Sequence, residues 1–334
     1  MIGAKQFCEF YTVARNIISN YLQSMSVDWV EKHCLEVLDY STKGGKLTRG
    51  VVCASAFIES TGCDPDSEEA KIGYTIGWVL ELMQAAFLIA DDFMDQSETR
   101  RGMICWYKIE SVNEQAVNDA MIVENLAFVL LDSVRSKLNI KSYARLVQYL
   151  RTINTITTMG QTLDFINKTK SFESYEVSVR NKTSHYSLCA PIILGLIASQ
   201  KFEVTDKFES IEKFALRLGY YFQVQDDYFD VYGDPQVTGK IGSDIKDGKN
   251  TWLFCKAYEL ANDEQKKTLD QKIGHEEFVE DIKKLYEEIK VKEAYHEFET
   301  NEGKELYAQL NHIESKYPKK TIEALVKKIV GRVY

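Results

Sequence analysis

Two long, apolar, helix-forming segments of this 334-residue chain each contain the same acidic pattern, Asp-Asp-x-x-Asp. The first copy begins at Asp91 and the second at Asp226. Because residues i and i+4 share a face of a helix, Asp91 aligns with Asp95, and Asp226 aligns with Asp230. Like charges at this spacing destabilise a helix by roughly 0.2–0.5 kcal/mol per pair. One such cluster is readily explained as a solvated acidic face, but two in apolar surroundings indicate bound cations. Hard carboxylate oxygens favour Mg2+.

The remaining sequence predicts an all-α protein. Helix formers dominate, alternating strand patterns are scarce, and there are only 4 Pro. Residues 70–96 and 206–231 are expected to form the helices that carry the acidic patterns, and residues 173–199 to form another helix. The chain is long enough to bury a large core and contains no obvious linker, so we expect residues 1–334 to form a single domain.

Charge and cysteine content narrow the class of protein. The formal net charge of -9 argues against nucleic acid or an anionic membrane as the main partner. It does not exclude an anionic substrate, because bound metal reverses the local sign of charge. The 7 Cys and 5 His show no metal-binding spacing, which favours a reduced, cytoplasmic protein. The apolar run 189–198 is too short to cross a membrane, so no span is expected.

Basic residues lie where two diphosphates could be bound. Gly45, Lys46 and Arg49 are at an expected helix start, where backbone N–H groups favour anions. Arg100 and Arg101 directly follow the first acidic pattern, and arginine binds phosphate in a bidentate manner. Three further candidates are lysines that, taken singly, are more often simply solvated: Lys182, Lys240 and Lys249.

Several motifs, in this order, resemble those of the trans-isoprenyl diphosphate synthases. They are GGKLTRG, ELMQAAFLIADDFMDQSETRRGMICWYK, GQTLD, KTSHYS, YYFQVQDDYFDVYGDPQVTGKIGSDIKDGKNTWL and a C-terminal basic stretch. The resemblance covers nearly the whole chain and is closest to the animal, insect-like farnesyl diphosphate synthases. It implies a large helical bundle of the isoprenoid synthase, or class I terpenoid, type around a central active-site cavity. It also implies a homodimer with three Mg2+ ions in each active site.

The resemblance further implies a role for each candidate residue. The metal ligands would be Asp91, Asp95, Asp226 and Asp230. The allylic diphosphate would be held by Arg100, Lys182 and Lys240. The isopentenyl diphosphate would be held by Lys46, Arg49, Gln84 and Arg101. Thr183 and Gln223 would face the reacting carbons, and Gly45 and Lys249 would complete substrate binding. The reaction implied is condensation of isopentenyl diphosphate with dimethylallyl or geranyl diphosphate through an allylic carbocation, giving geranyl or farnesyl diphosphate.

Some positions depart from the pattern of that family. Animal farnesyl enzymes have two aromatic residues at the floor of the pocket, where this chain has Ala86 and Phe87. Another side chain could fill the gap, or the pocket could be deeper. His185 replaces an aromatic residue, and the C-terminal stretch has lost two basic residues.

These departures favour an alternative, a terpene synthase that ionises a prenyl diphosphate such as farnesyl diphosphate to a sesquiterpene without condensation. The complete set of basic residues on the isopentenyl side favours the transferase. A non-catalytic partner subunit is a third reading, and two complete acidic patterns argue against it.

Overall fold

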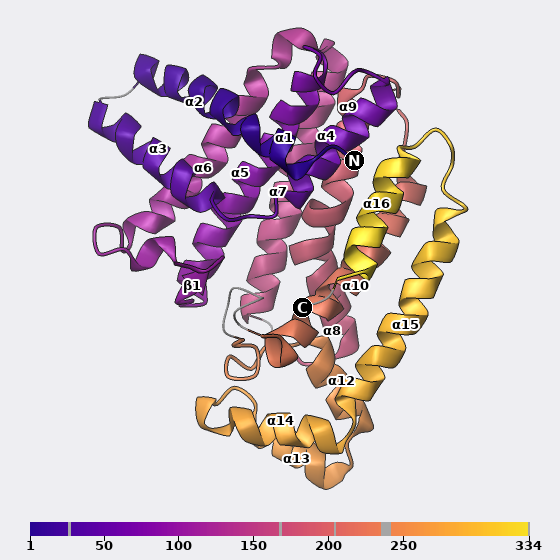
Figure 1. Cartoon of the computed structure of the whole chain (residues 1–334). Coiled ribbons are helices and arrows are strands. Elements are labelled where there is room, and N and C mark those ends of the chain that lie inside the picture. Colours follow the sequence, from indigo (N-terminus) through magenta and orange to yellow (C-terminus); the bar gives the residue numbers. More distant parts are fainter. Residues whose placement is uncertain (26–27, 167–168, 204, 235–241, 333–334) are drawn as a thin grey trace. The chain divides into compact units, whose positions relative to one another are not determined.

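The computed structural model describes residues 1–334 except 26–27, 167–168, 204, 235–241 and 333–334 (Figure 1). The described residues are 75% helical, and their only sheet is a pair of two-residue strands, so the all-α prediction is confirmed. The chain divides into two compact units, which we describe separately. Unit 1 comprises Met1–Thr152, Ala190–Phe208 and Glu314–Leu325, and unit 2 comprises Ile153–Cys189, Glu209–Ile313 and Val326–Tyr334. The single-domain expectation stays a prediction.

Unit 1 is built mainly from the first half of the chain. Its elements are α1 (Ala4–Glu9), α2 (Tyr11–Met25), α3 (Asp28–Thr42), α4 (Thr48–Thr61), α5 (Ala70–Met94), β1 (Thr99–Arg100), β2 (Met103–Ile104), η1 (Trp106–Lys108), α6 (Gln115–Asp132), η2 (Arg135–Lys137), the start of α7 (Ile140–Ile166), α9 (Ala190–Ala198) and the start of α16 (Lys319–Val330). The strands pair antiparallel, with Thr99 opposite Ile104.

The centre of unit 1 is α5, whose residues are buried almost without interruption from Ala70 to Ala86. Helix α4 crosses it closely, because a Cβ at Gly77 would lie only 2.6 Å from the carbonyl oxygen of Gly50. The ring of Phe7 fills the space beside this crossing and stacks on Trp78 at a centroid distance of 5.2 Å. The Trp78 indole also donates to the Phe7 carbonyl at 3.2 Å. The first helix of the chain therefore completes the core around α5.

Among the described helices, α5 alone is long and apolar enough to cross a membrane. The apolar run 189–198 does not meet this criterion. However, 89% of its most apolar window is buried inside the protein. A helix that is apolar all round and enclosed by protein is a core helix. We therefore assign α5 to the core of unit 1.

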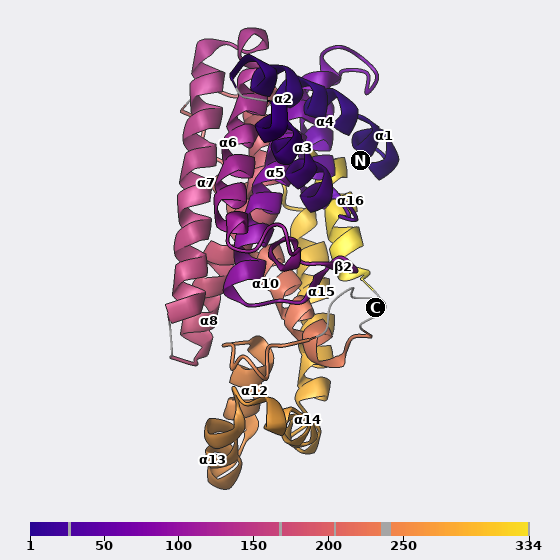
Figure 2. The same ribbon diagram turned by 90° about the vertical axis from the view of Figure 1, so that its left-hand side faces the viewer.

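Unit 2 contains the rest of the helices. Its elements are the end of α7, α8 (Phe172–Val179), η3 (Arg180–Cys189), α10 (Glu209–Tyr232), α12 (Trp252–Leu260), α13 (Asp263–Lys272), η4 (Glu276–Phe278), α14 (Val279–Glu288), α15 (Val291–Leu310) and the end of α16. Figures 1 and 2 both place α12, α13 and α14 next to one another. Three of these helices begin at a residue whose side chain accepts a backbone N–H, namely Ser171, Thr251 and Asn262.

Aromatic packing holds α10 against its neighbours in unit 2. Tyr228 on α10 stacks on Tyr295 of α15 with ring centroids 3.8 Å apart, and Trp252 of α12 meets Tyr295 edge to face. The expected helix over residues 173–199 is wrong as a single element, because α8 gives way to a π-helix, η3, before α9 begins. Such i→i+5 segments are frequently found at functional sites.

Candidate active site

The first acidic pattern is at the C-terminal end of α5, in unit 1. The backbone N–H of Asp95 donates to the carbonyl of Asp91 at 2.8 Å, so these two residues lie one turn apart. Both are partly exposed, whereas Asp92 between them is only 4% exposed. The pattern therefore offers its outer two carboxylates to solvent or a ligand, and turns its middle carboxylate into the protein.

Arg100 is the counter-ion of this pattern. It reaches back from β1 and donates through Nε to Asp92 Oδ1 at 2.8 Å and through Nη2 to Asp91 Oδ2 at 3.3 Å. Burial raises the pKa of Asp92, and the hydrogen bond and charge of Arg100 oppose that rise. Burial alone would lower the pKa of Arg100, but Asp92 and Asp91 together keep it above its ordinary value. Asp91, an expected metal ligand, is thus already beside a cation.

Arg101 turns the other way, towards the loop between α3 and α4. Its Nη1 donates to the carbonyls of Ser41 at 3.1 Å and Lys43 at 3.4 Å. A Cβ at Gly45 would lie 2.9 Å from the Arg101 Cζ, so a larger residue there would push the guanidinium aside. Unit 1 therefore brings Gly45 and Arg101 together. Lys46 is exposed and Arg49 is half-buried in the same loop and helix start.

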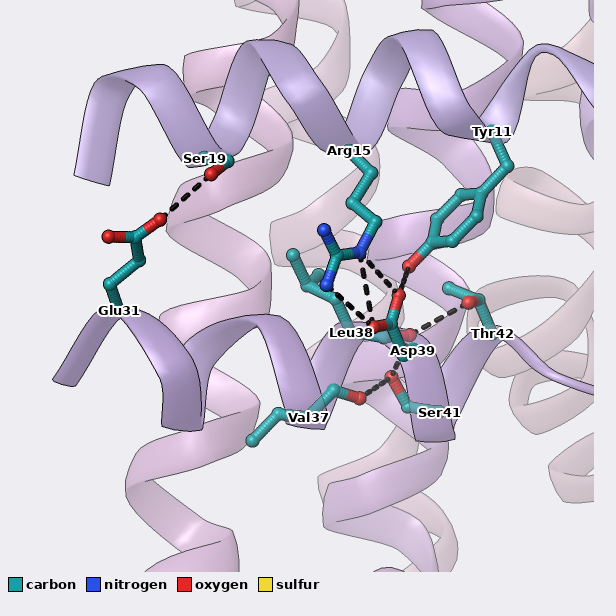
Figure 3. Close-up of polar contacts among 9 residues, drawn as sticks. All are labelled: Tyr11, Arg15, Ser19, Glu31, Val37, Leu38, Asp39, Ser41 and Thr42. Atoms are coloured by element: carbon teal, nitrogen blue, oxygen red, sulfur yellow. Dashed lines mark hydrogen bonds and ion pairs between the residues drawn. The ribbon is translucent and has the colours of Figure 1, made fainter. Parts of the chain in front are cut away.

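The end of α3, where this loop begins, is fixed by a cluster of polar contacts to α2 (Figure 3). Arg15 donates to both carboxylate oxygens of Asp39, with Nε and Nη2 each 2.9 Å from one of them, and the Tyr11 hydroxyl adds a third hydrogen bond at 2.8 Å. The hydroxyls of Ser41 and Thr42 donate to carbonyls of the preceding turn, at 2.7 Å. These contacts are partly exposed, so they position the turn more than they stabilise the fold.

The expected pocket residues are on α5, one to two turns before the acidic pattern. Ala86 is buried and Phe87 is half-buried. Gln84 is buried, and its Oε1 has no hydrogen-bond partner among the described residues. A buried amide oxygen without a partner is costly, so this atom is a candidate for ligand contact. A small cavity of about 30 Å³, enough for a water molecule, borders Asp92, Arg100 and Arg101 nearby.

The second acidic pattern is near the C-terminal end of α10, in unit 2, and has the same division of roles. Asp226 and Asp230 are partly exposed and Asp227 is buried. The two oxygens of Asp227 accept from Gln223 Nε2 at 2.9 Å and from the backbone N–H of Trp252 at 2.8 Å. Burial raises the pKa of Asp227 to about 7, against the opposing effect of these hydrogen bonds.

Gln223 links this carboxylate to the π-helix. Its Oε1 accepts the Thr183 hydroxyl at 2.9 Å while its Nε2 donates to Asp227. Beside Thr183, the Lys182 ammonium is 2.7 Å from Asp164 Oδ2, and the Lys249 ammonium lies 3.7 Å from the same oxygen. Unit 2 therefore contains two polar groups, Thr183–Gln223–Asp227 and Lys182–Asp164–Lys249, which adjoin at the neighbouring residues Lys182 and Thr183. Lys240 lies outside the described residues.

The sequence did not predict the contact made by Arg332, near the end of the chain. Its Nη1 lies 2.9 Å from Asp226 Oδ1, and its guanidinium covers the ring of Phe222 at 4.6 Å and that of Phe229 at 5.5 Å. The only signal was a basic residue in the C-terminal stretch. Asp230 is also engaged, because its Oδ2 accepts the backbone N–H of Asp244 at 2.9 Å.

Neither acidic pattern forms a finished metal site by itself. Within the described residues, no three His, Cys, Asp or Glu side chains converge as a ready-made ligand set. Each pattern instead offers two accessible carboxylates one turn apart. Carboxylate oxygens are the donors that Mg2+ takes, usually one or two from protein with phosphate and water completing the octahedron.

Comparison with known proteins places the chain in a class. The Polyprenyl synthetase family matches residues 31–289, so the chain belongs to this family. It is 34% identical to farnesyl diphosphate synthase 1 of Artemisia spiciformis, covering 92% of this chain and 89% of that protein. It is 36% identical to farnesyl pyrophosphate synthase of Saccharomyces cerevisiae, covering 83% and 82%.

The fold agrees with these matches. The structure of T. brucei farnesyl diphosphate synthase complexed with risedronate superposes with a TM-score of 0.90 at 25% identity, over 99% of both chains. The chain is therefore a prenyltransferase of isoprenoid biosynthesis, and the predicted family, fold and enzyme class are confirmed. These matches do not show whether the chain is most similar to the insect-like farnesyl diphosphate synthases, as the motifs suggested.

Proposed function

We propose that this prenyltransferase condenses isopentenyl diphosphate with dimethylallyl or geranyl diphosphate, giving geranyl or farnesyl diphosphate. One observation carries the proposal. Unit 1 has a second group of cationic side chains besides its acidic pattern, where Arg101 donates to the loop carbonyls of Ser41 and Lys43 next to Gly45 and Lys46. Gln84, with a buried oxygen that lacks a partner, is a further candidate ligand on α5. An enzyme that only ionises one diphosphate needs no second anion site.

The four outer aspartates, Asp91, Asp95, Asp226 and Asp230, would hold three Mg2+ ions. Their partial exposure and i, i+4 spacing support this assignment. Bound Mg2+ would stabilise the negative charge that develops on the departing diphosphate. Arg100, Lys182 and Lys240 would add hydrogen-bond donors to the same allylic diphosphate.

Thr183 and Gln223 would act next to the reacting carbons. Because the Thr183 hydroxyl donates its hydrogen bond to Gln223 Oε1, its oxygen lone pairs can face a developing allylic cation. Gln223 is held in turn by Asp227, so the pair is oriented before the substrate binds. Lys46, Arg49, Gln84 and Arg101 would hold isopentenyl diphosphate, with the close approach at Gly45 shaping the loop. Lys249 would support Lys182 through their shared neighbour Asp164.

Sesquiterpene formation from farnesyl diphosphate is the second candidate. Ala86 favours it, because a buried alanine at the pocket floor leaves room for a longer hydrocarbon than an aromatic ring would. The same substitution is also compatible with a transferase that makes a longer chain. The two functions differ in whether isopentenyl diphosphate is consumed.

We propose a cytoplasmic homodimer. Val117 and Met121, one turn apart on α6, are 50% and 59% exposed, as expected for an apolar surface that a second copy would cover. The net charge of -9 supports small anions bound with metal, rather than nucleic acid, as partners. Sedimentation of the purified protein tests the dimer, and imaging of the full chain in its own cells tests the location.

The decisive experiment supplies the purified protein and Mg2+ with isopentenyl diphosphate plus dimethylallyl or geranyl diphosphate, and separately with geranyl or farnesyl diphosphate alone. We expect condensed diphosphates from the pairs and no hydrocarbon from single substrates, measured by liquid and gas chromatography with mass spectrometry. Hydrocarbons or alcohols from farnesyl diphosphate alone would establish the lyase, and no product in any tube would contradict both.

A pair of variants controls this experiment. Asp91→Asn removes one outer carboxylate and should lower turnover by about 10²–10³-fold, the cost of losing one electrostatic contact to a developing charge. Asp66→Asn changes an exposed carboxylate that accepts a hydrogen bond from Gln6, and should leave turnover unchanged. Equal turnover in both variants would argue against the metal assignment.

A further inference from the structure

Glu81 is a buried carboxylate in the middle of α5 that the proposed reaction does not use. It is 5% exposed and is flanked by leucines in the segment VLELMQ. A buried carboxylate is stable only where hydrogen bonds and opposite charges compensate for its lost hydration. Its partners therefore show what it does.

The first partner is the start of α4. The Gly50 N–H donates to Glu81 Oε1 at 2.8 Å. Helix α4 has no side-chain cap of its own, because the residue before it is Leu47, in the left-handed region with φ 49°. The first N–H groups of a helix need an acceptor, and a negative charge there is favoured by the helix dipole. Glu81 supplies that acceptor from a different helix.

The second set of partners is a pair of arginines. Burial raises the pKa of Glu81, and the charges of Arg49 and Arg101 oppose this rise. Burial lowers the pKa of Arg101, the charge of Glu81 raises it, and the charges of Arg49 and Arg100 lower it. Geometry places these groups together at the start of α4. Arg49 directly precedes Gly50, whose N–H donates to Glu81, and Arg101 donates to the carbonyls of Ser41 and Lys43 just before that helix. The charge of Glu81 acts on both arginines from within this arrangement.

We propose that Glu81 is a positioning residue for the second diphosphate: it holds Arg49, Arg101 and the start of α4 in their binding arrangement in the free enzyme. The inference rests on the proposed function, because it assigns Arg49 and Arg101 to isopentenyl diphosphate. Glu81 itself touches neither substrate nor reacting atoms.

Two effects of removing this charge oppose each other. The site would become more positive, which by itself would tighten anion binding. Arg49 and Arg101, which are both half-buried, would also lose the attraction of the Glu81 carboxylate. Their side chains would then turn towards solvent. Loss of an oriented, bidentate donor is the larger effect where arginine is desolvated, so we expect weaker binding of the second diphosphate.

Steady-state kinetics of Glu81→Gln separate these effects. We expect the KM for isopentenyl diphosphate to rise about tenfold or more, while the KM for the allylic diphosphate changes less than about twofold. The matched control is Glu59→Gln. Glu59 also caps a helix start, accepting from the backbone N–H groups of Lys320 at 2.9 Å and Thr321 at 2.8 Å, but these contacts involve no arginine. Both variants should melt at a lower temperature, and only Glu81→Gln should change the isopentenyl KM.

An isopentenyl KM that matches Glu59→Gln, or one that falls below wild type, overturns the proposal. If Glu81→Gln does not fold, Glu81→Asp keeps the charge but withdraws it from Gly50, and we expect its isopentenyl KM to rise threefold or more. An unchanged value would overturn the proposal equally. Arg101→Gln tests the role of Arg101 in binding isopentenyl diphosphate separately from the role of Glu81. If it leaves the isopentenyl KM unchanged, the substrate assignment itself fails. If it raises that KM and the Glu81 variants do not, only the role of Glu81 fails.

Discussion

The two acidic patterns share the spacing Asp-Asp-x-x-Asp and the same division between outer and middle aspartates, but their middle residues are compensated differently. Asp92 is compensated by a charged partner, Arg100. Asp227 is compensated by neutral donors, the Gln223 amide and the Trp252 backbone N–H. Identical motifs therefore do not imply identical electrostatics. The first depends on a buried ion pair, and the second on hydrogen bonds that reach Thr183.

The strongest test of this difference is Asp92→Asn. It removes the negative charge of the buried Asp92 opposite the half-buried Arg100 guanidinium, and breaking one side of a buried ion pair costs about 3–5 kcal/mol. We expect the free energy of unfolding, measured by urea denaturation, to fall by that amount. In Arg100→Gln/Asp92→Asn the loss should be smaller than the sum of the single losses. Additive losses would contradict the ion pair.

Asp227→Asn should have a smaller effect. An asparagine amide has one oxygen, so either Gln223 or the Trp252 N–H loses its acceptor, at a cost of about 1–3 kcal/mol. The same denaturation experiment measures it, with Asp270→Asn on exposed α13 as a neutral control. A loss as large as that of Asp92→Asn would remove the distinction between the two motifs.

The tail contact predicts a weaker effect on metal binding. Arg332 lies on Asp226, an expected ligand, so a cation must compete with it. The Asp226 side chain is 36% exposed, and an ion pair with one partner exposed to this extent contributes up to about 1 kcal/mol. Arg332→Gln should therefore lower the Kd for Mn2+, titrated without substrate, by about two- to fivefold. Arg217→Gln, which removes an ion pair to Glu302 in the same unit, should leave the Kd unchanged.

The smallest effect concerns pH. Burial and then the charge of Arg180 lower the pKa of His185, which is 13% exposed. Its unfolded form therefore binds a proton more readily, so its contribution to stability is complete above pH 6.5 and is lost as pH falls. His185→Phe should gain up to about 1 kcal/mol in unfolding free energy relative to wild type on going from pH 8 to pH 5. His275→Phe, at an exposed histidine, should show no such gain. The absence of a difference would mean that the Glu212 carboxylate, whose Oε1 lies 3.8 Å from His185 Nδ1, offsets the effects of burial and of Arg180.

The sequence predicted the two motif-bearing helices closely. Residues 70–96 and 206–231 were expected, and α5 and α10 cover Ala70–Met94 and Glu209–Tyr232. Long periodic segments are the easiest to predict. The interruption at η3 was not predicted, because a π-helix uses the same residue types as an α-helix and differs only in which carbonyl each N–H reaches.

The candidate site was predicted less completely. Motifs identify residue types, so Asp91, Arg101 and Lys182 could be chosen from the sequence. They do not show which aspartate of each pattern turns inward, that Arg332 covers Asp226, or that Glu81 serves α4. Such contacts join positions 31 to 106 residues apart and depend on packing. The one available signal for Glu81 was a single charge inside an apolar helix.

The placement of Phe7 has a consequence for how the chain is assembled. Its ring lies between Gly50 and Gly77 and stacks on Trp78, so the surfaces that enclose it come from positions about 40 to 70 residues later. A ribosome adds residues in order, so the first helix emerges well before its binding surface exists. It must wait, unburied, until α5 has been made. Helix α1 is therefore synthesised before α5 but reaches its final position in unit 1 only after α5 has been made.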